Sequence, residues 1–254
     1  MSAVNRLASN SSSYPESLPR ERRRARGAFY TPSILVEHLV RAACRLLAGR
    51  GDAPRVLDPA VGDGAFLSAI RDRISAHLTG IDIDPLPVRH ARAALGGDAS
   101  ILCADFLGET PPVIGPFDLI IGNPPWGGWN RTLDAEAKKA IRSRFKTARG
   151  LLDPFGPFIE RSTSLLAEGG VLALVLPDHF LLKNYPAARR HVLDHYQIEE
   201  LARWGMAFSG VNLDACTLVA IRKRAGVRHR VRCLPDGPRG RAIRIPQSRF
   251  AARP

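Results

Sequence analysis

The chain has 254 residues, which is long enough to bury the core of one large α/β domain. Its formal net charge of +13 at pH 7 favours a polyanionic partner, with nucleic acid ahead of an acidic membrane surface. There is no stretch of about 18 apolar residues, so we expect neither a membrane-spanning helix nor a signal peptide.

The cysteines and histidines are scattered along the chain. Cys44, Cys103, Cys216 and Cys233 form no Cys-x-x-Cys pair, and the sequence contains no His-Glu-x-x-His pair. This spacing argues against a zinc site and against a disulfide framework. We therefore expect no bound metal and a protein of the reducing cytoplasm.

Residues 1–26 are low in apolar side chains and end in a cluster of arginines, which predicts a disordered basic tail. Such a tail is either solvated or an arm that contacts phosphate. Order is expected from residue 27, with Thr31 capping a helix and Pro32 at its first position. Gly49 or Gly51 would end that helix.

Strands and helices alternate through the rest of the chain. We expect strands at 55–58, 78–82, 99–105, 117–122, 171–177, 199–204 and 216–223. We expect helices at 65–76, 86–95, 155–170 and 185–195. This alternation predicts an α/β fold with a doubly wound, mostly parallel, seven-stranded sheet. Such sheets bind ligands at the carboxyl ends of their strands.

The stretch VLDPAVGDGAFL places Asp58 at a strand end and then turns sharply through Ala60, Gly62 and Gly64. Small residues in such a turn let a ligand approach the backbone, although a purely structural turn has the same pattern. Leu67 fills the third small position of the dinucleotide fingerprint. The ligand expected here is therefore a nucleoside without phosphates.

Further acidic residues follow the next two strands. Asp82 can accept both hydroxyls of a ribose, whereas Asp84 is better explained as a helix cap. Asp105 can accept the amino group of an adenine, and Phe106 either covers that base or packs in the core. Asp58, Asp82 and Asp105 lie at the ends of three successive strands, and this arrangement indicates one nucleoside site.

The stretch DLIIGNPPWGGW begins as a buried strand and then stops at Asn123, Pro124, Pro125 and Trp126. The Asn side-chain oxygen and a proline carbonyl can both accept hydrogen bonds from the amino group of a nucleobase, which makes that nitrogen more nucleophilic. Trp126 offers a stacking face for a base swung out of its helix. The alternative is a stiff, proline-rich loop with a partly buried Trp.

Several motifs, in order, resemble those of a known family. GAFYTP, DPAVGDGAFL, GIDIDP, ADFL and GNPPW resemble motifs of the gamma-class N6-adenine DNA methyltransferases of restriction–modification systems, and FGPFIERSTSLLAEGGVLALVLP resembles the segment that follows them. The resemblance covers residues 27–225. It implies a Rossmann-like class I methyltransferase fold, S-adenosyl-L-methionine as cofactor and double-stranded DNA as substrate.

The resemblance also implies roles for individual positions. The expected cofactor contacts are Thr31, Asp58, Ala60, Gly62, Gly64, Asp82, Ile83, Asp105 and Phe106. The expected catalytic residues are Asn123, Pro124, Pro125 and Trp126. Trp126 replaces the Tyr or Phe that often ends this motif in the family, and it keeps the stacking face. Phe208 matches an aromatic residue that packs against the flipped base, and an ordinary core position explains it nearly as well.

A segment rich in Lys and Arg, residues 130–150, follows the catalytic motif. It is either a solvated helix face or an element that contacts the DNA backbone without reading sequence. The candidate backbone contacts are Arg131, Lys138, Lys139, Arg142 and Arg144.

The family usually carries a separate target-recognition domain after the catalytic one. Residues 226–254 are strongly basic but too short for a folded reader of DNA sequence. Target recognition is therefore expected from a partner subunit or from a C-terminal domain that this chain lacks, unless specificity is loose.

The expected reaction is one in-line transfer of a methyl group to N6 of a flipped adenine, without a covalent enzyme intermediate. Cytosine-N4 and RNA methylation need the same acceptors; the motif order and GAFYTP favour adenine over cytosine, but charge alone does not separate RNA from DNA. Glutamine-N5 methylation of a protein would leave the positive charge unexplained. A non-catalytic DNA-binding remnant is a further alternative, which the intact Asn-Pro-Pro-Trp motif disfavours.

Overall fold

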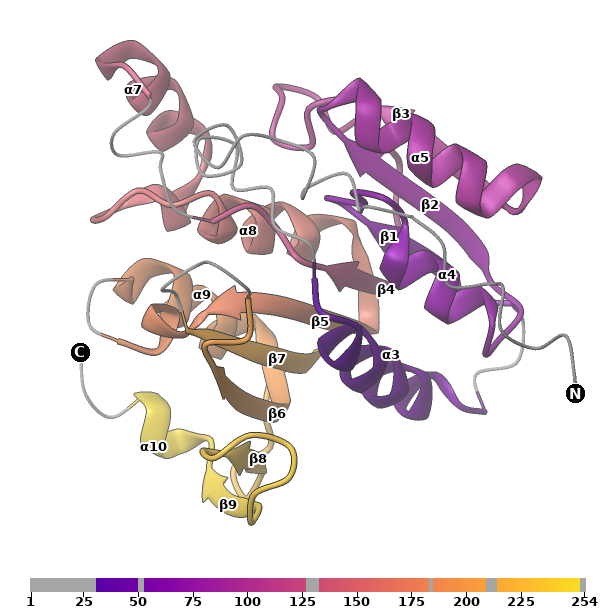
Figure 1. The fold of residues 1–254 in the computed structure, drawn as a ribbon. Coiled ribbons are helices and arrows are strands. Elements are labelled where there is room, and N and C mark those ends of the chain that lie inside the picture. The colour runs from indigo at the N-terminus through magenta and orange to yellow at the C-terminus, as the bar shows by residue number, and fades with distance from the viewer. Residues whose placement is uncertain (1–30, 50–52, 127–132, 183–184, 209–213, 252–254) are drawn as a thin grey trace, which may run out of the picture.

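The computed structural model describes residues 31–49, 53–126, 133–182, 185–208 and 214–251. Strands within these ranges form one central sheet (Figure 1). They are β1 (Arg55–Asp58), β2 (His77–Asp82), β3 (Ala99–Cys103), β4 (Phe117–Gly122), β5 (Leu166–Pro177), β6 (Tyr196–Gly205), β7 (Ala215–Arg222), β8 (Arg230–Leu234) and β9 (Ile243–Pro246).

Helices cover both faces of this sheet. The α-helices are α3 (Ser33–Leu47), α4 (Ala65–Arg71), α5 (Pro85–Leu95), α7 (Ala135–Arg144), α8 (Phe155–Leu165), α9 (Pro186–His195) and α10 (Ser248–Ala251), and the 3₁₀ turns are η1 (Gly96–Asp98), η2 (Lys146–Ala148) and η3 (Asp178–Leu181). Helices α3, α4 and α5 pack on one face, and α8 and α9 pack on the other. In the described part of the chain, no helix is both long and apolar enough to cross a membrane.

The strand order is β3-β2-β1-β4-β5-β7-β6-β8-β9. The first five strands in this order are parallel, β7 is antiparallel to β5 and β6, and β8 runs parallel to β6. The order reverses between β1 and β4, which is the switch point where ligands bind in sheets of this type. The carboxyl ends of β1, β2, β3 and β4 therefore meet at one edge, which we call the catalytic edge.

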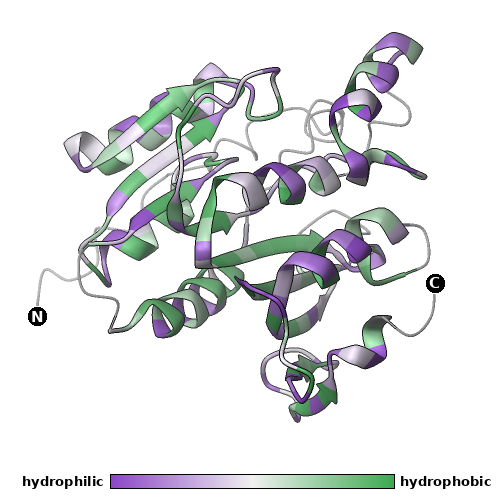
Figure 2. Ribbon diagram, turned by 180° about the vertical axis from the view of Figure 1, so that it is seen from behind, coloured by the Kyte–Doolittle hydropathy of each residue, from purple (hydrophilic) through white to green (hydrophobic). Residues whose placement is uncertain are grey.

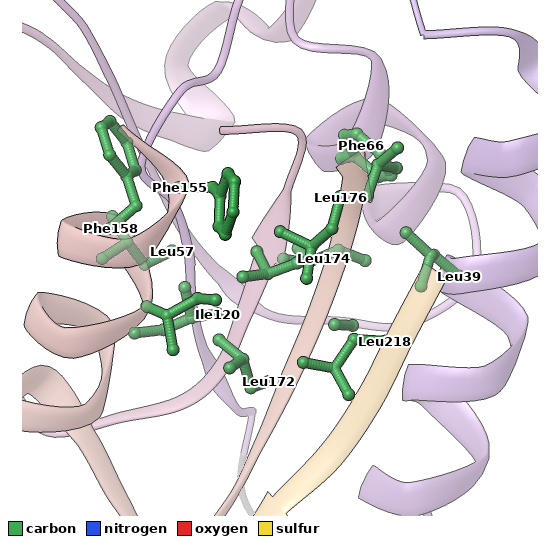
Figure 3. Packing of buried hydrophobic residues seen from close by; sticks show 14 of the residues in the cluster. Leu39, Leu57, Phe66, Ile120, Phe155, Phe158, Leu172, Leu174, Leu176 and Leu218 are labelled. Carbon is green, nitrogen blue, oxygen red and sulfur yellow. The ribbon is translucent and has the colours of Figure 1, made fainter. Parts of the chain in front are cut away.

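Apolar strand residues form the centre of the core. Leu57 of β1 is paired with Ile120 of β4, which is paired with Leu172 of β5. Figure 3 shows these side chains between Leu39 of α3 on one side and Phe158 of α8 on the other. Strands buried on both faces explain the continuous apolar runs of the sequence. Seen from behind, the strands are largely hydrophobic and the helices carry hydrophilic stripes (Figure 2).

Two predicted helices are longer than the observed ones. The helix expected at 65–76 ends at Arg71, where a turn leads into β2. The helix expected at 155–170 ends at Leu165, because Leu166 already pairs with Phe117 of β4. The sequence offers no stop signal before Gly169, which adopts a φ of +76° within β5.

The described sheet has nine strands, so the predicted count of seven is wrong. The two additional strands, β8 and β9, come from the basic segment at residues 226–254. Val231 is fully buried in β8, which pairs with β6. The Gln247 side chain donates to Tyr196 O at 2.7 Å and accepts from Ile198 N at 2.8 Å, so it joins this segment to β6.

Candidate active site

The turn after β1 holds a buried carboxylate. Asp58 is 0% exposed, and its Oδ1 accepts a hydrogen bond from Ala60 N at 3.0 Å. Its Oδ2 is buried without a hydrogen-bond partner among the described residues. Burial raises the pKa of Asp58 well above its usual range, and Asp82 and Asp63 raise it further. The site therefore has one buried carboxyl oxygen that still needs a hydrogen-bond partner.

Glycine backbone conformations shape the rest of this turn. Gly62 has φ +53° and Gly64, which precedes α4, has φ +92°, in the left-handed region that glycine adopts without strain. A Cβ added to Gly62 would meet no atom of the described chain within 4 Å. The turn thus leaves open space beside its backbone, as a ligand that approaches closely requires.

Asp82 connects this turn to β2. Its Oδ2 accepts from Gly62 N at 3.0 Å, and its Oδ1 accepts from Asp84 N at 2.9 Å. Burial raises the pKa of Asp82 despite these two hydrogen bonds. Asp84 is the N-cap of α5 and accepts from Leu86 N at 3.1 Å, which confirms the predicted cap.

The loop after β3 carries Asp105, whose Oδ1 accepts from Leu107 N at 2.8 Å. The two apolar side chains expected around an adenine lie in different surroundings. Ile83 is 68% exposed, whereas Phe106 is 2% exposed and its ring centroid lies 5.0 Å from that of Phe158. Phe106 therefore packs in the core, and the adenine contacts of both residues stay predictions.

The predicted catalytic motif leaves β4 directly beside Asp58. A Cβ added to Gly122, the last residue of β4, would collide with Asp58 Oδ1. Asn123 and Pro124 follow immediately, and Pro124 is buried. The predicted cofactor turn and the predicted catalytic motif thus meet at the switch point between β1 and β4.

The Asn123 amide is held by two side chains. Its Nδ2 donates to Thr31 Oγ1 at 3.1 Å, and its Oδ1 accepts from Trp126 Nε1 at 2.7 Å. An indole nitrogen only donates, so the amide atom facing it must be the oxygen. The prediction that Thr31 caps a helix is wrong: α3 begins at Ser33 after Pro32, without a side-chain cap.

The two aromatic residues expected around a flipped base contact each other. Trp126 is 2% exposed, and its ring packs edge-to-face against Phe208, with a centroid separation of 5.4 Å. A base can stack between these rings only after one of them moves. The structure therefore brings the predicted pair together, and the stacking role of each ring stays a prediction.

The predicted backbone contacts separate into distinct environments. Lys139 and Arg142 are exposed on α7, which projects from the body of the protein, and Lys138 is half-buried there (Figure 1). The guanidinium of Arg144, at the end of α7, donates to Leu107 O at 2.7 Å. Arg131 lies outside the described residues.

Arg161 on α8 is a site residue that the sequence did not predict. It is 8% exposed, and its Nη1 donates to Phe106 O at 2.9 Å and to Gly108 O at 2.7 Å. The only local signal is its place one helical turn after the buried Phe158.

Residues 109–208 match the model of the Eco57I restriction-modification methylase family. The Type II methyltransferase M.TthHB8I of Thermus thermophilus is 35% identical over an alignment of 228 residues that covers 84% of this chain and 48% of that protein. The chain is a relative of the restriction–modification methyltransferases. A release factor glutamine methyltransferase of Rhodospirillum rubrum is 38% identical over 150 residues, 54% of this chain and 44% of that protein.

A solved structure from Listeria monocytogenes, assigned to the class I S-adenosylmethionine-dependent methyltransferases, superposes with a TM-score of 0.64 at 19% identity. The match covers 80% of this chain and 65% of that one. The predicted class I methyltransferase fold is thereby confirmed. The present chain spans about half the length of the two curated relatives above.

Proposed function

We propose that this restriction–modification relative transfers a methyl group from S-adenosyl-L-methionine to N6 of a flipped adenine in double-stranded DNA. One observation carries the proposal: Gly122, which leads into the Asn-Pro-Pro-Trp motif, lies against the buried carboxylate of Asp58. A cofactor held by the turn after β1 and a base held by Asn123 would therefore be neighbours.

The acidic residues of the catalytic edge fit the cofactor part by part. The unpartnered Oδ2 of Asp58 suits the ammonium group of its methionine moiety, and the open backbone at Gly62 leaves room for the ligand. Asp82 suits the ribose hydroxyls, and Asp105 suits the adenine amino group. When bound, S-adenosylmethionine supplies an electrophilic methyl group on its sulfonium.

Asn123 and Pro124 would prepare the adenine nitrogen for attack. Oδ1 of Asn123 and the carbonyl of Pro124 accept hydrogen bonds from the two N6 hydrogens and stabilise the positive charge that develops on nitrogen. N6 would take the methyl group while the sulfonium sulfur leaves as a neutral thioether, and N6 would then release one proton to water. Alignment of the two reactants supplies much of the rate enhancement.

The charge distribution supports DNA as the partner. Residues 222–251 contain ten Lys or Arg and one acidic residue, Asp236. The turn between β8 and β9 lies at the catalytic edge, because β8 runs parallel to β6. It borders a groove of about 510 Å³ whose lining includes Ile34, Trp204 and Arg239. Arg239 and the other basic side chains of this segment suit the phosphate backbone, and sequence recognition would come from a partner subunit or a further domain.

Protein glutamine methylation is the second candidate, and the 38% identity to a release factor glutamine methyltransferase favours it. The match to M.TthHB8I covers more of this chain, and the net charge of +13 suits a polyanionic substrate rather than a protein. DNA is therefore the first substrate to test.

The test is transfer of labelled methyl from S-adenosylmethionine to duplex DNA, RNA and a glutamine-containing release factor in parallel. Digested nucleic acid is analysed for N6-methyladenine, and Asn123→Ala, which removes the proposed acceptor Oδ1, serves as the control. Label in DNA N6-methyladenine that disappears with Asn123→Ala is the expected result. Label in another arm, or cofactor binding without transfer in any arm, would overturn the proposal; the latter would favour the DNA-binding remnant.

A further inference from the structure

In the loop that follows β3, main-chain carbonyls accept hydrogen bonds from side chains of helices that lie outside the sheet. β3 ends at Cys103, so the loop Asp105–Gly108 lies beyond the strand ladder. Nη1 of Arg161 donates to Phe106 O at 2.9 Å and to Gly108 O at 2.7 Å. One guanidinium from α8 therefore spans the loop.

A second guanidinium binds the carbonyl between these two. Nη1 of Arg144, at the end of α7, donates to Leu107 O at 2.7 Å. Both guanidinium groups lie over the ring of Phe145, with Cζ–centroid distances of 5.6 Å for Arg144 and 5.1 Å for Arg161. Three consecutive carbonyls are thus held by two cations that share one aromatic ring.

Burial of a cation that is paired with main-chain carbonyls costs free energy. Arg161 is 8% exposed; its burial lowers the pKa of the guanidinium, and neighbouring Arg144 lowers it further, while Asp105 raises it. Charge-assisted hydrogen bonds offset such a cost where they specify one conformation of a segment. Here the segment is the one that orients Asp105, since Leu107 N is the donor to Asp105 Oδ1.

We propose that Arg144 and Arg161 are positioning residues for the adenine part of the cofactor, which act by fixing the conformation of the Asp105–Gly108 loop. The proposal rests on the proposed function, because that function assigns the adenine amino group to Asp105. Neither arginine needs to touch the cofactor. Each sets the direction of the carboxylate through the backbone that carries it.

The experiment compares Arg144→Gln with Arg142→Gln, two residues earlier on α7. Like Arg144, Arg142 is exposed, and it donates to Gly150 O at 3.5 Å. Its replacement therefore removes the same charge and leaves the Asp105–Gly108 loop untouched. Calorimetry measures binding of S-adenosylmethionine and of adenosine. Arg144→Gln should weaken both by on the order of tenfold, the scale of removing one charge-assisted hydrogen bond. Arg142→Gln should change neither.

Arg161 is tested with Arg161→Met and Arg161→Lys, since Lys keeps a cationic donor. Arg161→Met should weaken cofactor binding at least as much as Arg144→Gln, and Arg161→Lys should restore part of it. In methyl transfer, the KM for S-adenosylmethionine should rise while kcat at saturating cofactor stays within about twofold. A lower kcat at unchanged KM, or an unchanged affinity for adenosine in Arg144→Gln, would overturn the proposal.

Binding measurements need no methyl acceptor, so this test separates the two proposals. If the wild-type chain binds S-adenosylmethionine and methylates a substrate other than DNA, the proposed function fails and the loop test still applies. If the wild-type chain binds and neither Arg144→Gln nor Arg161→Met changes the affinity, only the positioning proposal fails. Thermal unfolding of each variant shows whether its fold is retained.

Discussion

The indole N–H of Trp126 donates to Oδ1 of Asn123 across 2.7 Å. The proposed reaction requires the same oxygen as an acceptor for the adenine amino group. The indole and the target amine would therefore share one acceptor atom, whose two lone pairs can take both hydrogen bonds. Because Trp126 is also buried against Phe208, a base that stacks between the two rings must displace their contact.

Replacing Trp126 with Phe keeps an aromatic face and removes the indole N–H that donates to Asn123. We expect Trp126→Phe to retain methyl transfer, whereas Trp126→Ala should weaken target binding by roughly 5- to 150-fold, because stacking of one base contributes about 1–3 kcal/mol. The measurement is kcat/KM for duplex DNA in both variants, with Asn123→Ala as the reference for complete loss. An equal loss in Phe and Ala variants would mean that the N–H itself is required.

Gly122 should be intolerant of any side chain. The Cβ of Gly122→Ala would collide with the buried Asp58 carboxylate, and relief of such overpacking typically costs about 1–3 kcal/mol. We therefore expect urea unfolding to reveal a loss of stability of that size. Gly97→Ala is the matched control, since a Cβ there meets no described atom within 4 Å. Equal midpoints for the two variants would show that Asp58 moves aside at little cost.

The positions of the turn after β1 and of the Asn-Pro-Pro-Trp motif were predictable because their signals are local. Asp58, Asp82 and Asn123 each lie at or directly after the end of an apolar strand, and the fold brings strand ends to one edge. Arg161 was not predictable, because its partners are main-chain carbonyls 53 and 55 residues earlier in the chain. A carbonyl belongs to every residue and leaves no trace in the side-chain pattern.

Other features were hidden by competing signals. A Thr-Pro pair is a common helix start, yet the Thr31 hydroxyl is used by Asn123, which lies 92 residues further along the chain. The strand β8 reads RVRCL, and its arginines obscured the buried positions Val231 and Leu234. The Trp126–Asn123 bond needs a bent loop that composition alone does not specify.

Cofactor binding should weaken on the acid side of neutrality. Burial raises the pKa of Asp82, whereas ribose hydroxyls donate to the ionised carboxylate and so lower that pKa on binding. The contribution of Asp82 to cofactor affinity is then fully present above its raised pKa and is lost as pH falls through that pKa. The folding stability of the chain without cofactor has the opposite pH dependence. The carboxyl of Asp82 binds its proton more tightly in the folded than in the unfolded chain, so its contribution to stability falls as pH rises.

Calorimetry in two buffers of different ionisation enthalpy measures the protons released when S-adenosylmethionine binds. Asp82→Asn should bind more weakly, and with a shallower pH dependence than the wild type, since one titrating acceptor is removed. Asp58, whose pKa is also raised, would account for the dependence that remains. Proton uptake on binding by the wild type would contradict this assignment.

The basic turn between β8 and β9 should contact the DNA backbone. Arg239 and Arg241 are exposed on this turn at the catalytic edge, whereas Arg224 and Arg228 are exposed between β7 and β8 at the opposite edge. The double variant Arg239→Ser/Arg241→Ser should bind duplex DNA more weakly, with a salt dependence shallower by about 0.9 in log–log slope for each phosphate that is no longer neutralised.

Arg224→Ser/Arg228→Ser removes the same charge from the same basic segment, so it separates a local contact from the general effect of net charge. Titrations of both doubles at several salt concentrations, with duplex DNA of one length, provide the comparison. A reduced slope confined to the Arg239→Ser/Arg241→Ser variant would locate the DNA-backbone contact at the catalytic edge. Equal reductions in both double variants would mean that DNA affinity depends on the overall charge of the chain and not on this turn.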